Sequence, residues 1–507
     1  MAGLTYPAAI HTHRQLNHDV DQRSISIYDA TTDGEAVDDT LLLDPRPSTR
    51  ADDPLNWSWA KKHAVLAALI PGCLLSDWTL TWGTAVFPMQ AAEWGMTVEQ
   101  VSHSVSPGIA LQGLGGLVAV PLCERYGRLP VLFYSQLFSL AATVGATLAP
   151  SYGAFTAFRA LQGFAGAPPQ VLGLCVVHDL FFAPDRARKV NLWAASFLVG
   201  PYLGPLLSGL LALRLGWRDD FAVLAGLYAL SVVVVAALGD ETLFVRAGMP
   251  ARGEGAGRGR SEREKGVNGG RASSSSLRGV WRNQCSLLAR PYLLLPTALF
   301  ITPITMWTIG MVMTVSQFVL PPVSAGGYGF STVALSMLHF SPIVGTVLAE
   351  AWGHWFNDFL AARHMARFGP ECRLTATYPA VLVGAAGLVL FGQTLDHNLS
   401  WVGLAFGWAM LCFSTLANMT AVSAYLLDCL PRQAALTAAW LNFARVVGGF
   451  SVAYFQMPWF HRNGPALSFG LQAVVMVGAT LAVLATQIWG RTWRVRFPAP
   501  RGGEGTA

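Results

Sequence analysis

Residues 219–239 read DDFAVLAGLYALSVVVVAALG, and no charged side chain follows the two leading aspartates. An α-helix rises about 1.5 Å per residue, so about 20 apolar residues can cross a hydrocarbon core about 30 Å thick. The core of a soluble protein does not require so long an apolar run. The stretch therefore predicts a helix that crosses a membrane.

Similar apolar runs, separated by polar residues or by Pro and Gly, recur along the rest of the chain. With the first stretch they predict an all-α membrane protein of twelve transmembrane helices, six in each half. The predicted helices cover 62–87, 101–122, 130–149, 154–178, 190–213, 219–239, 291–320, 331–352, 374–395, 399–427, 435–459 and 466–489.

The composition agrees with a lipid environment. Hydrophobic residues make up 53% of the 507-residue chain and charged residues only 12%, whereas soluble proteins carry about 25% charged residues. The formal charge is +5, but the basic residues lie between apolar runs and form no continuous patch with interleaved aromatics. We therefore expect a lipid bilayer as partner and no nucleic acid.

Signatures of other protein classes are missing from the sequence. The seven cysteines form no CxxC pair, and Cys73, Cys175 and Cys412 fall inside apolar helices. The eleven histidines do not cluster as metal ligands, and there is no GxxxxGK[ST] phosphate loop. We expect no metal, no cofactor, no ATP-driven pump and no enzyme, while a non-transporting sensor stays possible.

The expected organisation has five parts. Residues 1–60 are polar, contain no cleavable signal peptide and are predicted to form a disordered cytoplasmic tail. A six-helix bundle should follow at 61–240, then a flexible, Gly/Ser/Arg-rich linker at 241–290. A second six-helix bundle is expected at 291–490 and a cytoplasmic tail at 491–507.

Basic residues predict the orientation, because Lys and Arg are retained on the cytoplasmic side. With both termini inside, cytoplasmic segments hold 29 of the 34 Lys and Arg, and the outer loops hold only Arg214, Arg218 and Arg462. Arg159 and Arg445 lie within helices. The sequence predicts a multi-pass protein of the cell membrane with both termini cytoplasmic.

A short loop after the second helix reads CERYGRLP at residues 123–130. It resembles the loop 2–3 signature of the major facilitator superfamily. That resemblance implies a fold of two pseudo-symmetric six-helix bundles and a gating latch formed by Glu124, Arg125, Gly127 and Arg128. Retention of positive charge in the cytoplasm is the simpler explanation of the same residues.

A weaker copy of the signature occurs one half later. Glu350-Ala351-Trp352-Gly353 is followed by Asp358 and Arg363 in a predicted cytoplasmic loop. The recurrence supports two homologous halves.

The fifth predicted helix contains GPYLGP at residues 200–205, followed by Ser208-Gly209. This resembles the motif of superfamily exporters, which favours antiport. The motif positions are Gly200, Pro201, Gly204, Pro205 and Gly209, which we expect at the seam between the halves. Ordinary packing of small residues is the alternative.

Two further stretches, DPLNWS at 53–58 and the residues from Tyr425 to Asp428 with Pro431, are similar to the fungal drug:proton antiporter branch. Helix four resembles the family's R-x-x-x-G pattern from Arg159 to Gly163, and helix eleven carries Arg445 before Gly448 and Gly449. The resemblance implies transport by alternating access.

Asp77 is the carboxylate expected deepest within a predicted span. A charge near the bilayer centre costs at least ~2.5 kcal/mol and is usually turned toward a partner or a water-filled cavity. Arg159 lies at a similar predicted depth, and helices one and four adjoin in the resembled fold. We therefore predict that Asp77 carries a proton and that Arg159 tunes its affinity, or that the two form a permanent structural pair.

A substrate cavity is expected near the midplane between the halves. Aromatic and amide side chains suit a mid-sized organic molecule, although each aromatic has packing as its simpler explanation. The candidates are Trp78, Trp82, Gln112, Gln162, Gln170, Trp307, Gln317, Asn418 and Asn442. Asn398-Leu399-Ser400 is a candidate glycosylation site in an outer loop.

These observations predict proton-coupled efflux of a small organic compound, such as a drug, toxin or secondary metabolite. Proton-coupled import of a polyamine or another small nutrient is the alternative. The expected partners are the substrate and protons, and we expect a monomer.

Overall fold

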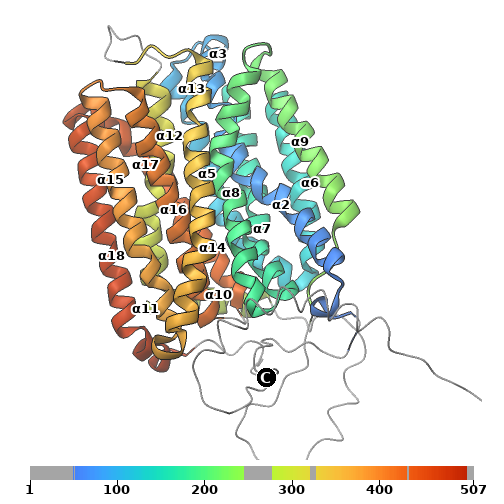
Figure 1. Cartoon of the computed structure of the whole chain (residues 1–507). Helices are drawn as coiled ribbons and strands as arrows, with labels where there is room; N and C mark the ends of the chain where they lie inside the picture. The colour runs from blue at the N-terminus through green and yellow to red at the C-terminus, as the bar shows by residue number, and fades with distance from the viewer. Residues whose placement is uncertain (1–49, 51, 245–276, 320–326, 431–432, 499–507) are drawn as a thin grey trace, which may run out of the picture.

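The computed structural model describes residues 50, 52–244, 277–319, 327–430 and 433–498. The described part is helical and contains no strand (Figure 1). Twelve helical stretches within it are long and apolar enough to cross a membrane, which confirms the predicted fold class.

The first half contains the turns η2 (Pro54–Asn56) and η3 (Thr84–Val86) and eight helices. These are α2 (Trp59–Thr81), α3 (Phe87–Trp94), α4 (Val98–Ser102), α5 (Val105–Tyr126), α6 (Arg128–Thr147), α7 (Tyr152–Leu180), α8 (Ala183–Leu211) and α9 (Trp217–Leu238).

The second half follows the same plan. Its elements are α10 (Leu277–Leu288), α11 (Pro291–Leu294), the π-helical turn η4 (Leu295–Ile301), α12 (Thr302–Phe318), α13 (Thr332–Leu338), α14 (Phe340–Phe368), the 3-10 stretch η6 (Gly369–Ala376), α15 (Thr377–Asp396), α16 (Trp401–Cys429), α17 (Ala434–Asn463) and α18 (Pro465–Arg496).

The first span is broken near its outer end, where sequence periodicity predicts one helix over 62–87. Helix α2 ends at Thr81, and the chain continues through η3 and α3. Gly83 forms the break with φ +84°, a conformation that side chains rarely adopt, and a Cβ there would lie 2.8 Å from the Phe221 ring. The last carbonyls of α2 therefore lack the partners that a continuous helix would supply.

The end of the predicted flexible linker is a helix instead. In α10, Leu287 and Gln284 are fully buried. Gln284 Nε2 donates to the carbonyl of Leu117 on α5 at 3.3 Å, and Trp440 Nε1 on α17 donates to the carbonyl of Gln284 at 2.9 Å. The α10 helix is thus held to both halves by direct hydrogen bonds.

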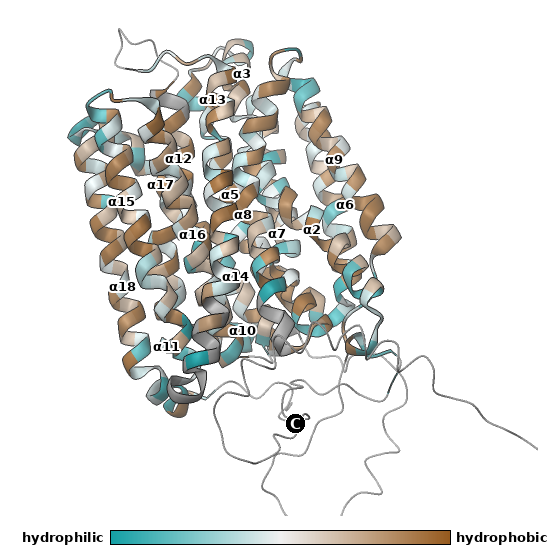
Figure 2. Cartoon of the chain, viewed as in Figure 1, coloured by the Kyte–Doolittle hydropathy of each residue, from teal (hydrophilic) through white to brown (hydrophobic). Residues whose placement is uncertain are grey.

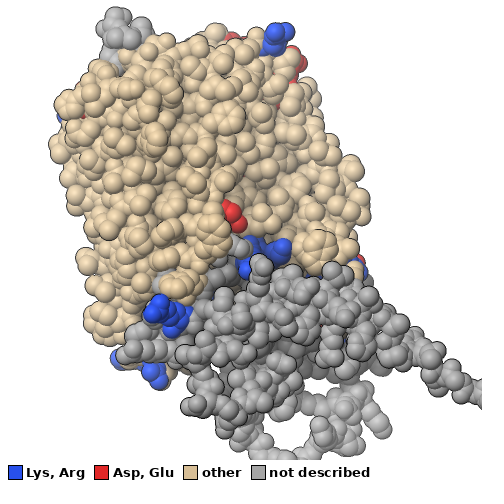
Figure 3. Space-filling view, viewed as in Figure 1, with Lys and Arg blue, Asp and Glu red and all other residues tan. Residues whose placement is uncertain are grey.

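The two halves lie side by side in Figure 1, the first in blue to green and the second in yellow to red. Helix α5 packs against α17 across their interface, and α8 packs against α13, α14 and α16. Large apolar side chains such as Val233, Val474 and Leu481 are exposed on the surface, as suits a surface that meets hydrocarbon. Figure 2 shows hydrophobic residues, in brown, recurring along the outer helices α9, α15 and α18. The face drawn in Figure 3 shows a broad band nearly free of charged side chains.

Within the first half, α5 and α7 touch backbone to backbone. A Cβ at Gly163 on α7 would overlap the carbonyl oxygen of Gly108 on α5, whereas Gly153 on the same helix has no neighbour within 4 Å. Small residues at such crossings let membrane helices approach closely.

We therefore expect Gly163→Ala to lower the free energy of unfolding by about 1 to 3 kcal/mol, because the overlap forces a backbone shift. Thermal unfolding of the purified protein in detergent measures this. Gly153→Ala is the matched control and should not lower the melting temperature. Equal melting temperatures for the two variants would contradict the packing described.

Candidate functional site: a buried ion pair between the halves

Asp77 lies near the middle of the bundle on α2, and only 2% of the residue is exposed. Its Oδ1 accepts a hydrogen bond from Gln112 Nε2 on α5 at 2.6 Å and one from Gln170 Nε2 on α7 at 2.8 Å. Gln170 also donates to Ser76 Oγ at 2.6 Å. Three helices of the first half thus position one carboxylate.

The ionic partner of Asp77 comes from the other half. Arg445 on α17 places Nη1 2.5 Å from Asp77 Oδ2 and Nη2 3.2 Å from Oδ1. Such two-pronged contacts between arginine and a carboxylate are among the stronger hydrogen bonds in proteins. Nη2 also donates to Gln170 Oε1 and to Asn442 Oδ1, each at 3.0 Å. The ion pair therefore joins the two halves at mid-depth.

The predicted pairing of Asp77 with Arg159 is wrong. Arg159 is buried, but it donates to the carbonyls of Thr79 at 2.6 Å and Leu80 at 2.7 Å on α2. These carbonyls lie at the broken end of α2, where the backbone acceptors have no continuing helix to bond them. Arg159 is thus a cap for that helix end.

A small cavity of about 30 Å³ borders the ion pair. It is lined by Asp77, Gln112, Pro201, Thr308, Thr415 and Arg445, among others. One water needs about 10 to 15 Å³, and small-molecule sites measure about 300 to 1,000 Å³. The cavity therefore has room for water but not for a mid-sized organic molecule.

Contacts between the halves lie on both sides of this cavity. At the α10 end, Asn191 on α8 donates to the carbonyl of Glu350 at 3.0 Å and accepts from Thr420 Oγ1 at 2.8 Å. At the other end, Gly209 on α8 approaches Ser336 on α13 so closely that a Cβ would overlap the serine hydroxyl.

The predicted cavity residues divide into two groups. Gln112 lines the cavity, and Gln170 and Asn442 bond to the Asp77–Arg445 pair beside it without lining it. The others with described side chains do not line this cavity: Trp78 stacks on Trp82, Gln162 donates to Thr143, Trp307 packs on Phe455 and Trp459, and Asn418 donates to Ser414. The side chain of Gln317 lies outside the described residues.

The glycines of the fifth-helix motif pack mainly inside the first half, not at the seam. Added Cβ atoms at Gly200 and Gly204 would each lie 2.7 Å from the backbone of Trp78 on α2. Of the five motif positions, Gly209 reaches the second half, Pro201 lines the cavity and Pro205 is buried.

Tyr202, which the sequence analysis missed, is the motif residue that reaches α16. Cys412 Sγ donates to its hydroxyl at 2.9 Å, and its ring packs edge-on against Trp408 at 5.9 Å. Two separate motif faces therefore contact α2 and α16.

The predicted gating loop is held by carboxylates that sequence reasoning did not assign. Arg128 forms an ion pair with Asp179 at the end of α7. Glu241, beyond α9, accepts from the backbone N–H of Arg128 at 2.9 Å and of Leu129 at 3.2 Å. Gly127 has φ +98°, and a Cβ there would overlap the Glu241 carboxylate. These contacts all lie within the first half.

Other predicted loop residues have simpler surroundings. Glu124 is half-buried, whereas Arg125 is exposed and lies over the Tyr126 ring, 5.4 Å from its centroid. In the second half, the exposed Arg363 lies 5.8 Å from the Phe359 ring centroid. The side chain of Asp358 lies outside the described residues. Asn398 is exposed between α15 and α16, where its glycosylation stays a prediction.

Asp220, another buried carboxylate, was also missed, because it stands at the start of a predicted span. Asp220 in the first turn of α9 is fully buried and accepts from Ser208 Oγ on α8 at 2.7 Å. This bond lies beside Gly209, the close contact to the second half.

We expect Arg445→Gln to destabilise the protein by about 3 to 5 kcal/mol, because it leaves Asp77 buried without its counter-charge. Adding Asp77→Asn should restore part of that loss, which a double-mutant cycle of thermal unfolding in detergent would measure. Arg363→Gln, at an exposed position, serves as the control. If Asp77→Asn restored the stability lost in Arg159→Gln but not the stability lost in Arg445→Gln, the pairing would be misassigned.

Comparisons with known proteins agree with this architecture. An MFS-type transporter of Macrophomina phaseolina, mpsC, is 26% identical over 477 residues, which cover 91% of each chain. The probable efflux pump mfs2 of Aspergillus flavus is 27% identical over 422 residues, covering 80% of this chain and 97% of that protein.

The fold is also found among solved structures. The proton:xylose symporter XylE matches with a TM-score of 0.59 over 85% of this chain and 96% of its own, at 13% identity. That identity supports likeness of fold alone. A model of the Major Facilitator Superfamily matches residues 68–453, most of the chain. This chain is therefore a member of the Major Facilitator Superfamily, a membrane transporter and not an enzyme.

Proposed function

We propose that this chain exports a small organic compound in exchange for protons, with Asp77 as the proton carrier and Arg445 as its partner. The observation that carries the proposal is the buried ion pair, which joins the two halves beside the small cavity. Ionisable residues inside membrane domains commonly mark ion and proton pathways.

The chemistry of the pair supplies the coupling. An ionised Asp77 attracts Arg445 and so holds α2 of the first half to α17 of the second. A proton on Asp77 removes this attraction and leaves the charge of Arg445 without a counter-charge. The closed arrangement is then destabilised by about 3 to 5 kcal/mol relative to arrangements in which the halves are apart. Protonation therefore favours separation of the halves, which opens the cavity.

Exchange follows if proton and substrate compete for the same groups. Asp77 can accept a hydrogen bond or an ion pair from a substrate only after its proton has left. Arg445, once released, becomes a donor in the opened cavity. One carboxylate that serves both ligands in turn gives antiport without a second coupling site.

Relatives support export over import. The similar proteins mfs2 of Aspergillus flavus and radE of Floropilus chiversii are named as a probable efflux pump and an efflux pump. We further propose a cell-membrane location with both termini cytoplasmic, from the distribution of Lys and Arg.

Transport measurements test the direction. We expect cells that express the chain to accumulate less of at least one dye from a panel including rhodamine 6G and ethidium, and a protonophore should abolish the difference. Asp77→Asn should abolish it too, with unchanged protein in the membrane, whereas Asp219→Asn, the same change at an exposed carboxylate, is the control. Undiminished efflux by Asp77→Asn would exclude Asp77 as carrier, and proton-driven uptake of labelled spermidine would favour import.

The gating role can be measured without a substrate. Hydrogen–deuterium exchange is corrected for the intrinsic slowing of amide exchange at lower pH, and the protection of α5 and α17 in the wild-type protein should then decrease as pH falls, because protonation loosens the interface that these helices form. In Asp77→Asn, the corrected protection should be low and independent of pH in the same helices. An equal pH response in both proteins would refute Asp77 as the switch.

A further inference from the structure

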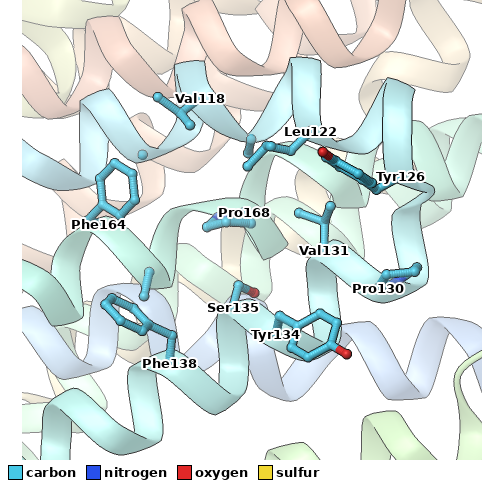
Figure 4. Close-up of a pocket in the computed structure, with 13 residues that line it drawn as sticks. Val118, Leu122, Tyr126, Pro130, Val131, Tyr134, Ser135, Phe138, Phe164 and Pro168 are labelled. Carbon is cyan, nitrogen blue, oxygen red and sulfur yellow. The ribbon is translucent and has the colours of Figure 1, made fainter. Parts of the chain in front are cut away.

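A large groove lies on the outside of the first half, away from the ion pair. It measures about 610 Å³ and is formed by α5, α6 and α7. Figure 4 shows Leu122 and Tyr126 along one wall and Tyr134 and Phe138 along the other. Tyr134 is 66% exposed and Phe138 47%, so the groove opens on the surface that faces the membrane.

The walls are almost entirely apolar, and the groove follows the membrane normal. The lining residue Ser135 has its hydroxyl bonded to the Leu132 carbonyl, so it presents no free donor. Along α5 the lining extends from Gly115 to Tyr126, about 16 Å of helix. The hydrocarbon of one leaflet is about 15 Å thick, half of a core of about 30 Å. The groove therefore has the depth of one acyl chain.

The end of the groove nearest the loop at Gly127 is polar. Tyr126 is 59% exposed, and its phenol ring belongs to the lining. Arg125 follows Val118 and Leu122 by seven and three residues, so it lies on the same face of α5 as these lining side chains. Arg125, Tyr126 and Tyr134 thus lie at the end of the groove where the headgroup of a lipid would join its acyl chain.

Arg125 differs from its neighbour Arg128 in its contacts. Arg128 is paired with Asp179, whereas no ion pair of Arg125 is found among the described residues, and its guanidinium lies over Tyr126. Glu124 stands two positions from both Leu122 and Tyr126, hence on another face of the helix. The positive charge of Arg125 complements an anionic headgroup.

The floor of the groove argues against a lateral substrate entrance. A Cβ at Gly115 would overlap the carbonyl oxygen of Phe164, and Gly163 touches Gly108 in the same way. Helices α5 and α7 thus close the groove from behind by direct backbone contact. A molecule in the groove has no passage to Asp77 in this state.

We propose that this groove binds an anionic phospholipid, with one acyl chain along α5 and α6 and its phosphate at Arg125. The lipid comes from the leaflet on the α10 side, which the proposed orientation makes cytoplasmic. The lipid fills the gap between α5 and α6, above α7, and its binding does not depend on transport activity.

Native mass spectrometry of the delipidated full-length protein tests the site, with dioleoyl phosphatidylglycerol and dioleoyl phosphatidylcholine as probes. We expect phosphatidylglycerol to bind about fivefold more tightly, the factor that one basic residue near an anionic surface supplies. Arg125→Gln should remove the preference, whereas Arg363→Gln, an exposed control in the other half, should keep it. Equal binding of the two lipids by the wild type, or a preserved preference in Arg125→Gln, would overturn the proposal.

A second variant tests the chain-binding part. Val118→Trp places an indole in the groove and should weaken binding of both lipids, whereas Val233→Trp on the outer face of α9 should leave binding unchanged. Unchanged binding in Val118→Trp would place the lipid elsewhere. Displacement of phosphatidylglycerol by ergosterol in the wild type, with no effect of Arg125→Gln, would assign the groove to a sterol and refute the phospholipid.

Discussion

The architecture depends on one constraint, that a charge inside hydrocarbon must find a partner. Asp77 satisfies it across the boundary between the halves, through Arg445. The amides of Gln112 and Gln170 hold the carboxylate in place within the first half, and Arg445 reaches it from the second half. Any separation of α2 from α17 must therefore break this ion pair.

The spans and the buried carboxylate could be predicted from sequence, because hydropathy and charge depth are properties of the chain alone. The partner of Asp77 could not be predicted, since Arg159 and Arg445 both lie within membrane-spanning helices and depth does not give side-chain direction. The break at Gly83 decided between them. It exposes carbonyls at the end of α2, and Arg159 bonds these instead of the carboxylate.

The motif glycines show a similar division. Their sequence indicates a close helix contact, and Gly200 and Gly204 do make one, but with α2 in their own half. Which neighbour a small residue meets depends on helix rotation, which short motifs do not encode. Asp179 and Glu241 were missed for a related reason. Asp179 lies at the end of α7 and Glu241 just beyond α9, where acidic residues are common, and only the folded structure shows that both contact Arg128.

The α10 helix is bonded to Leu117 in one half and to Trp440 in the other. If the halves move apart at the α10 end of the bundle, α10 cannot stay bonded to both, so at least one of these hydrogen bonds must break. Opening at the opposite end leaves both attachments in place. In the proposed transport cycle, opening at the α10 end therefore breaks a bond that opening at the opposite end keeps.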